Sequence, residues 1–134
     1  MKSRYEVITI SPYKDCRGEL KKVFTKNMLG INESVEEIYV LYTNGNSIRG
    51  NHYHKKNVEY FSVIKGTATI ALRDLETDST DVFRISSKDN VVIRVPENTA
   101  HSFRNDEEEE LVILAAASRQ YEPRDTDTYP LRLL

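Results

Sequence analysis

The chain has 134 residues, of which 19 are basic and 21 acidic, and its formal net charge at pH 7 is −2. This length predicts one domain with a single core, and the near-balanced charge argues against nucleic acid or an anionic membrane as a partner. The longest apolar run, at residues 111–117, is too short to cross a bilayer, and no apolar segment follows the charged N-terminus as a signal peptide requires. Cys16 is the single cysteine and cannot form an internal disulfide, so we expect a cytoplasmic protein.

Short runs of β-branched and aromatic residues recur along the chain, separated by Gly, Asn, Asp or Pro, and helical periodicity is nearly absent. In chain order the predicted strands are 7–10, 20–24, 37–42, 58–64, 67–73, 82–85, 91–95, 101–104, 111–117 and 129–133. Within 67–72 larger apolar residues alternate with Thr and Ala, which is typical of a half-buried strand. Many short strands with closely spaced turns predict an all-β sandwich or barrel over residues 1–134. The acidic run at residues 106–110 is predicted to be a solvated loop.

Two of the three histidines lie one residue apart in the stretch RGNHYHKKNVEYFSVIKG. Side chains two positions apart on a strand point to the same face, so the imidazoles of His52 and His54 can meet at one point. Glu59 lies five positions after His54, where a straight strand would turn it to the opposite face. A turn or bend predicted at residues 55–57 lets Glu59 begin the next strand and point back. The third histidine, His101, follows a proline that ends a strand and an asparagine that favours a turn.

The combined pattern, His-x-His-x4-Glu-x6-Gly and then Pro-x-Asn-x2-His-x3-Asn, resembles the two motifs of the cupin superfamily. The first motif is matched at His52, His54, Glu59 and Gly66, and the second at Pro96, His101 and Asn105. Three glycines usual in these motifs are replaced by Asn46, Asn90 and Asn98. Asparagine is the next residue most tolerant of a left-handed backbone, so this departure is mild. The resemblance covers most of the chain and implies the cupin fold, a double-stranded β-helix or jelly-roll barrel.

The resemblance also implies one divalent transition metal, held by His52, His54, Glu59 and His101. Three imidazoles and one carboxylate suit zinc first, and iron(II), manganese or nickel as well. The alternative is a vestigial pocket, because cupins similar to this one can lose the metal and keep the histidines. Metal-free relatives commonly carry glutamine or another residue in place of Glu59, so its presence favours a metal.

The flanking segments resemble cupins that act on nucleotide-linked deoxysugars. Residues 15–20 are similar to their Asp-x-Arg-Gly opening, and residues 48–54 to a segment of the dTDP-4-dehydrorhamnose 3,5-epimerases and dTDP-sugar 3,4-ketoisomerases. The strongest resemblance, which includes a tail at residues 127–131, is to the metal-binding cupin half of the bifunctional capsule enzyme of UDP-N-acetyl-L-fucosamine synthesis. It implies an isomerase or epimerase that transfers a proton next to the ketone of a nucleotide-linked 4-keto-6-deoxyhexose in surface-polysaccharide synthesis. A reductase or an aminotransferase of the same pathway would then be a separate polypeptide.

Four further residues are candidates for the site. Tyr39 resembles a catalytic tyrosine of the ketoisomerases, although an aromatic residue on a strand is more often core. Arg49 is a candidate for catalysis and for binding a substrate phosphate or hydroxyl, with a solvated strand-end charge as the alternative. Lys55 is expected near the pocket mouth, where it could meet a pyrophosphate, with a lysine that only keeps a strand edge soluble as the alternative. Phe103, two residues after His101, is expected to wall the pocket and contact substrate.

Two other function classes stay open at this point. Three histidines and a glutamate also suit an iron(II)-dependent dioxygenase, and a cupin can bind or sense a sugar without catalysis. Small cupins usually pair, often by exchanging N-terminal strands. The mostly apolar segments 7–10 and 129–134 would be natural edges to cover, so we expect a homodimer.

Overall fold

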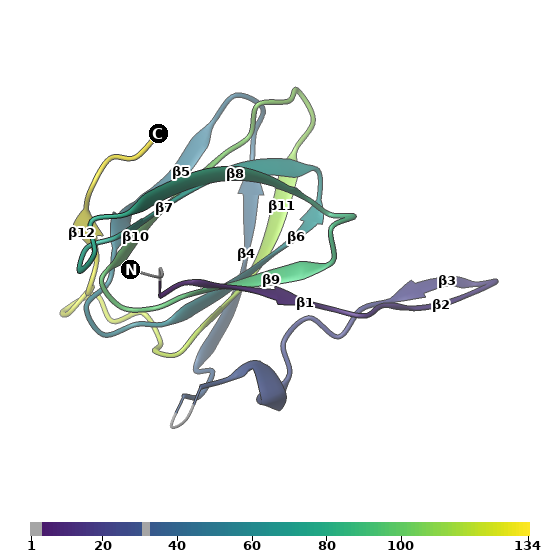
Figure 1. Ribbon diagram of the computed structural model, residues 1–134, viewed down its shortest axis with the longest axis horizontal. Helices are drawn as coiled ribbons and strands as arrows, with labels where there is room; N and C mark the ends of the chain where they lie inside the picture. The colour runs from purple at the N-terminus through teal and green to yellow at the C-terminus, as the bar shows by residue number, and fades with distance from the viewer. Residues whose placement is uncertain (1–3, 31–32) are drawn as a thin grey trace.

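The computed structural model describes residues 4–30 and 33–134, and nearly all regular structure within them is β-strand. The first antiparallel sheet consists, in spatial order, of β1 (Glu6–Thr9), β9 (Val91–Val95), β6 (Glu59–Lys65), β11 (Leu111–Ala117) and β4 (Glu37–Thr43). The second consists of β12 (Tyr129–Pro130), β5 (Ile48–Tyr53), β10 (Thr99–Arg104), β7 (Thr67–Asp74) and β8 (Thr80–Ser86). The two sheets curve around a common interior, which is the jelly-roll barrel that the sequence predicts (Figure 1).

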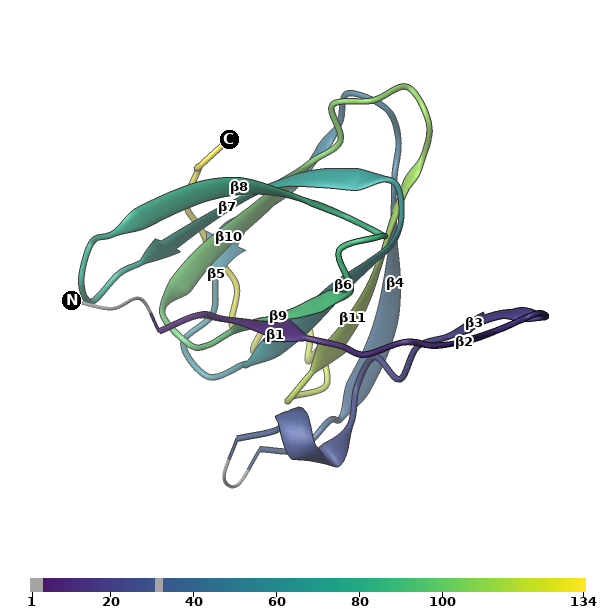
Figure 2. The same ribbon diagram turned by 45° about the vertical axis from the view of Figure 1, so that its right-hand side comes forward.

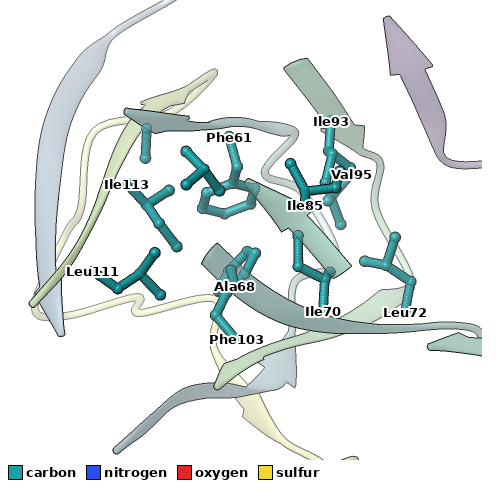
Figure 3. Packing of buried hydrophobic residues seen from close by; sticks show 12 residues of the cluster. Phe61, Ala68, Ile70, Leu72, Ile85, Ile93, Val95, Phe103, Leu111 and Ile113 are labelled. Atoms are coloured by element: carbon teal, nitrogen blue, oxygen red, sulfur yellow. The ribbon is translucent and has the colours of Figure 1, made fainter. Parts of the chain in front are cut away.

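Apolar side chains from both sheets fill this interior (Figure 3). Phe61 and Ile113 of the first sheet belong to one cluster with Ile70, Leu72 and Phe103 of the second, and none of the five is more than 3% exposed. The larger residues of β7 thus point into the core, as their alternation with Thr and Ala predicts. Burial of this cluster holds the two sheets together and supports the strands that carry the histidines.

β7 is buried on both faces, and the prediction of a half-buried strand is wrong in this respect. Thr69 and Ala71 alternate with the core residues, yet they are only 5% and 0% exposed. Thr69 lies in register between Arg84 of β8 and Arg104 of β10. Side chains that are neighbours across strands lie within contact distance, so long ones cover short ones between them.

A second apolar cluster covers the outer face of the first sheet. Tyr60 and Val92 pack there with Val23 and Phe24. The strand predicted at 20–24 is therefore wrong beyond residue 20: this apolar pair lies in an irregular segment that leads to the short helix η1 (Lys26–Met28). No helix in the described part of the chain has the length and apolar character needed to span a membrane.

A two-stranded hairpin, β2 (Tyr13–Asp15) and β3 (Gly18–Leu20), projects from the barrel (Figures 1 and 2). Among the strands of residues 4–30 and 33–134, each pairs only with the other. Its turn is closed locally, because the Asp15 carboxylate accepts hydrogen bonds from the backbone and guanidinium of Arg17 at 2.9 and 3.1 Å. Strands of three residues are too short to show alternation, so the sequence pattern does not predict this hairpin.

Asparagines occupy left-handed backbone positions at three turns, as expected from their match to motif glycines. Asn46, Asn90 and Asn98 have φ angles of 60°, 54° and 58°. The strand predicted at 129–133 is present only as β12, and the chain beyond it is irregular. This tail is nevertheless held on β5, because Leu131 N–H donates to the Asn51 carbonyl at 2.8 Å.

Candidate metal centre

Strands of both sheets bring the four predicted ligands together. His52 lies in β5, and His54 directly follows that strand. His101 in β10 lies opposite His52 in register. Glu59 is the first residue of β6, which belongs to the other sheet, and a bend at residues 55–56 connects it to His54. The site therefore bridges the two sheets.

A bulge in β5 adjusts the chain next to the histidines. Ser102 pairs with Gly50 and His101 with His52, so Asn51 is an extra residue, and it has a φ of 57°. Gly50 has a φ of 90°, and a Cβ at this position would lie 2.7 Å from the carbonyl oxygen of His101. Only glycine accepts this backbone and this close approach.

The ligand atoms of the four residues fit one metal ion. One atom from each of His52, His54, Glu59 and His101 can be chosen so that all four lie within 4.8 Å of one another. Glu59 Oε1 is 2.6 Å from His54 Nε2 and 3.6 Å from His101 Nε2. Ligands of one ion, each at ~2.1 Å from it, would be separated by comparable distances, so the set is close to the spacing that a metal requires.

Unpartnered polar atoms point to the same centre. His54 Nε2 and Glu59 Oε1 are buried and have no hydrogen-bond partner among the described residues, because their short approach lacks hydrogen-bond alignment. Buried polar atoms are nearly always paired, and an unpaired one is costly. A cation between them would satisfy both.

Backbone carbonyls orient two of the imidazoles from behind. His54 Nδ1 lies 2.7 Å from the carbonyl oxygen of Asp127, and His101 Nδ1 lies 3.5 Å from that of Thr99. A carbonyl can only accept, so the proton is on Nδ1 and the lone pair of Nε2 is directed to the centre. Such outer contacts accompany metal-binding histidines.

The pKa values favour a negative carboxylate among mostly neutral imidazoles. Burial would raise the pKa of Glu59, but His54, His101 and Tyr39 outweigh it and hold the pKa at about 2. Burial lowers the pKa of His101 to about 4 and also lowers that of His52. Burial acts in the same direction on His54, but close contact with Glu59 raises its pKa above the usual value. Of the three imidazoles, His54 thus has the greatest tendency to carry a proton.

Tyr39 of β4 completes the buried cluster. Its hydroxyl donates a hydrogen bond to Glu59 Oε2, which leaves Oε1 for the histidine side. Burial and the neighbouring carboxylate of Glu59 raise the pKa of Tyr39 far above neutral pH. Tyr39 therefore keeps its proton and acts as a donor.

A cavity of about 230 Å³ opens beside this cluster. Its wall includes Glu37, Tyr39, His52, His54, Asn57 and Glu59, together with residues 117, 119–122 and 125–128 of the C-terminal segment. Of the residues that line the cavity in the described part of the chain, five are acidic and one, Arg119, carries a permanent positive charge. The cavity thus suits a cation and a neutral group, with Arg119 available to an anion.

Phe103 is absent from the described wall of this cavity, and its contact with substrate stays a prediction. It shares the inward face with His101, as predicted, but it is 2% exposed and belongs to the core cluster. Its ring packs against Phe61 at a centroid distance of 4.7 Å and lies 5.9 Å from the His101 ring. Phe103 supports the histidine from the core.

Arg49 and Lys55 are also absent from the described cavity wall. Arg49 lies beyond the β5 bulge, opposite Phe103 in register, and its guanidinium donates to the carbonyl of Tyr42 at 3.2 Å. The ammonium of Lys55 lies 4.3 Å from the centroid of the Tyr129 ring. Arg49 thus bridges to β4 and Lys55 packs on the tail, and their roles in catalysis and substrate binding stay predictions.

The C-terminal segment contributes residues that sequence reasoning missed. Arg119 and Tyr121 line the cavity, and Asp127 contacts His54. No sequence motif surrounds Arg119. Its place in the cavity wall depends on the path that the chain takes after β11. Asp127 lies in the tail segment 127–131 that resembles the capsule enzyme, but this resemblance predicted no role for the residue.

Residues 13–129 match the model of the family described as Polysaccharide biosynthesis C-terminal domain. A curated relative, the Spore coat polysaccharide biosynthesis protein SpsL of Bacillus subtilis (strain 168), is 29% identical over 85 residues. That alignment covers 60% of this chain and 56% of the relative, so it spans little more than half the length of SpsL.

Solved structures with the same fold include enzymes of nucleotide sugars. A dTDP-4-dehydrorhamnose 3,5-epimerase from Bacillus anthracis, with TDP and PPi bound, has a TM-score of 0.81 at 19% identity, covering 95% of this chain and 78% of its own. The 3,4-ketoisomerase QdtA from Thermoanaerobacterium thermosaccharolyticum, in complex with TDP, has 0.79 at 20%, covering 96% and 88%. The capsular polysaccharide assembling protein CapF from Staphylococcus aureus has 0.69 at 21%, covering 92% and 33%. The expected resemblance to these cupins is confirmed at the level of the fold.

Proposed function

Because the chain belongs to the Polysaccharide biosynthesis C-terminal domain family, we propose that it is a sugar-nucleotide epimerase or ketoisomerase of surface-polysaccharide synthesis. The reaction is proton transfer next to the ketone of a nucleotide-linked 4-keto-6-deoxyhexose. The observation that carries this proposal is the buried cluster of three histidines, Glu59 and a protonated tyrosine at the wall of one cavity.

The proposed metal ligands are His52, His54, Glu59 and His101, and zinc is the first candidate, ahead of iron(II), manganese and nickel. When bound, the metal supplies positive charge to the ketone oxygen and so stabilises the enolate. Two neutral imidazoles and a carboxylate that stays ionised far below pH 7 are ready to bind it.

Two side chains of β4 are our candidates for the proton steps. Tyr39 keeps its proton at neutral pH, lines the cavity and can donate to the oxygen of the enolate or to carbon. Glu37 lies two residues earlier on the same face of the strand, and its carboxylate also lines the cavity. We assign Glu37 as the base of the metal-loaded site, because coordinated imidazoles have no free lone pair. In the metal-free site the pKa of His52 is low, so His52 is neutral and can take the proton instead.

The charge of the cavity orients the substrate. With five carboxylates in its wall, the cavity is unfavourable for a pyrophosphate and accepts the neutral sugar ring. Arg119 is the permanent cation of the described wall, so we place the phosphates on its side. The TDP named with two of the similar structures makes a thymidine nucleotide the first carrier to try.

The test is hydrogen exchange at C3. The protein is incubated in deuterated water with 4-keto-6-deoxyhexoses linked to TDP, UDP or GDP, and the C3 proton is followed by NMR. We expect exchange with one of them, and chelation should slow it. No exchange across the panel would rule the proposal out. Tight binding without exchange would identify a sugar-binding module, and oxygen uptake by the iron-loaded protein would identify a dioxygenase.

We also propose that two copies pair, which the projecting hairpin supports. Tyr13 and Leu20 of the hairpin are 63% and 56% exposed, and β4, at the edge of its sheet, exposes Ile38, Val40 and Tyr42. A two-stranded hairpin is barely stable alone, and an edge strand with apolar side chains favours pairing.

We propose further that a separate reductase or aminotransferase consumes the product of this reaction in the cytoplasm.

A further inference from the structure

The side chain and the carbonyl of Asp127 both contact the segment that carries the metal ligands. The carboxylate accepts three consecutive backbone N–H groups, from Lys55 at 2.9 Å and from Lys56 and Asn57 at 3.0 Å each. Its carbonyl oxygen lies 2.7 Å from His54 Nδ1. Asp127 is 9% exposed, so these contacts are largely shielded from water.

The bend that Asp127 holds lies in the short covalent link between His54 and Glu59, two ligands of the proposed centre. It begins directly after His54 and ends three residues before Glu59. Three N–H groups converging on one carboxylate make charge-assisted hydrogen bonds, which are stronger than neutral ones. The shape of the bend, and with it the distance between His54 and Glu59, therefore depends on this carboxylate.

The backbone conformation of Asp127 lets both its carboxylate and its carbonyl oxygen face the bend. Its φ of 48° lies in the left-handed region, which aspartate enters more readily than most residues. The segment around it is fixed on both sides: Asp125 pairs with Lys56 at 2.8 Å, and Tyr129 of β12 stacks on Tyr53 of β5. The tail is thus an anchored part of the site.

We infer that Asp127 is a positioning residue for the metal centre, an inference that rests on the metal site of the proposed function. Its carboxylate sets the spacing of His54 and Glu59, and its carbonyl holds the proton of His54 on Nδ1 so that Nε2 faces Glu59 Oε1, 2.6 Å away. Loss of an outer contact of this kind lowers metal affinity by about 10- to 100-fold.

The experiment measures metal binding and its geometry without turnover. Wild type, Asp127→Asn and Glu108→Gln are stripped of metal and titrated with Co²⁺ against a competing chelator, and the visible absorption of bound Co²⁺ is recorded. Asp127→Asn keeps the size of the side chain and the backbone carbonyl but removes the charge from the three N–H groups. We expect about 10- to 100-fold weaker binding and an altered Co²⁺ spectrum for Asp127→Asn. Glu108→Gln, which removes an exposed acid outside the cavity wall, should behave as wild type.

Equal affinity and an identical spectrum for Asp127→Asn would overturn the role of Asp127 and leave the proposed function standing. Failure of wild type to bind Co²⁺ or Zn²⁺ would overturn the metal centre itself. If Asp127→Asn does not unfold cooperatively, Asp127→Glu decides the question, because it keeps the charge and displaces the carboxylate. A Co²⁺ spectrum different from wild type would support the inference, and an identical one would refute it.

Discussion

The pairing of Tyr39 with Glu59 separates the two oxygens of one buried carboxylate. Oε2 accepts the tyrosine proton, whereas Oε1 faces His54 and His101. The tyrosine therefore orients a proposed ligand, and we propose that it also donates a proton in the cavity. Burial and the adjacent carboxylate raise its pKa, so it holds its proton at neutral pH.

Replacing Tyr39 by Phe removes the donor and keeps the ring. We expect the rate of C3 exchange to fall by about 100- to 10,000-fold, the range for loss of a positioned acid, while zinc stays bound. Exchange is followed by NMR and zinc by elemental analysis. Tyr42→Phe, an exposed tyrosine on the same strand, is the matched control. An unchanged exchange rate in Tyr39→Phe would remove Tyr39 from the mechanism.

Metal affinity should depend on pH through His54. Its pKa is raised in the metal-free protein, because contact with Glu59 outweighs burial, so the metal must displace a proton below that pKa. His52 and His101 have lowered pKa values and are neutral at pH 7. We therefore expect proton release on binding that comes from His54 below its raised pKa and disappears at higher pH. Calorimetry in buffers of different ionisation enthalpy measures it, and a proton release that does not fall as the pH rises would contradict the assignment.

At the scale of elements, the bulge in β5 decides which side chains reach the cavity. One extra residue, Asn51, lies between His52 and Gly50, and the strand beyond it carries Arg49 to the edge of β4 instead of to the cavity. A bulge is not visible as alternation, because its extra residue breaks the period of two. On the core-facing side of the same strands, the large apolar residues are buried as predicted, because their burial depends only on their spacing along the strand.

Gly50→Ala tests the bulge. The added Cβ would lie 2.7 Å from the His101 carbonyl oxygen at a φ of 90°, so the backbone of β5 or β10 must shift. We expect a loss of about 1–3 kcal/mol in the free energy of unfolding, measured with denaturant on the metal-free protein, together with weaker Co²⁺ binding. Gly18→Ala, in the projecting hairpin where nothing lies within 4 Å, should leave Co²⁺ affinity unchanged. Wild-type stability and affinity in Gly50→Ala would show that the site tolerates a different bulge.

At the scale of the whole molecule, apolar surface remains on the outside of the first sheet. Segment 21–29 covers part of it, whereas Ile38, Val40 and Tyr42 on β4 stay exposed. The hairpin of β2 and β3 extends away from the barrel (Figure 2). An exposed edge strand and a projecting hairpin on the same chain can complement each other across a symmetric dimer.

We expect wild type to sediment as a dimer at micromolar concentration and Ile38→Asp to shift it towards monomer. The carboxylate would be buried without a partner if β4 lies in the interface. Val82→Asp, at a residue of β8 that is 59% exposed, is the control and should stay dimeric. Sedimentation of wild type as a monomer only would contradict the pairing.

The strand pattern of the barrel and the asparagines at left-handed turns could be predicted from spacing along one strand and from the backbone preference of one residue, which are local properties. The joint placement of three histidines with Glu59 was expected from the resemblance to the two cupin motifs, because His101 and Glu59 lie on strands of different sheets. The cavity wall depended on tertiary structure. Asp127 and Arg119 reach the site because the tail returns to β5 and the chain leaves β11 beside it, whereas Arg49 and Phe103 are kept away by a bulge and by the core. These placements arise from contacts between residues about 50 to 80 positions apart, and no local sequence pattern predicts them.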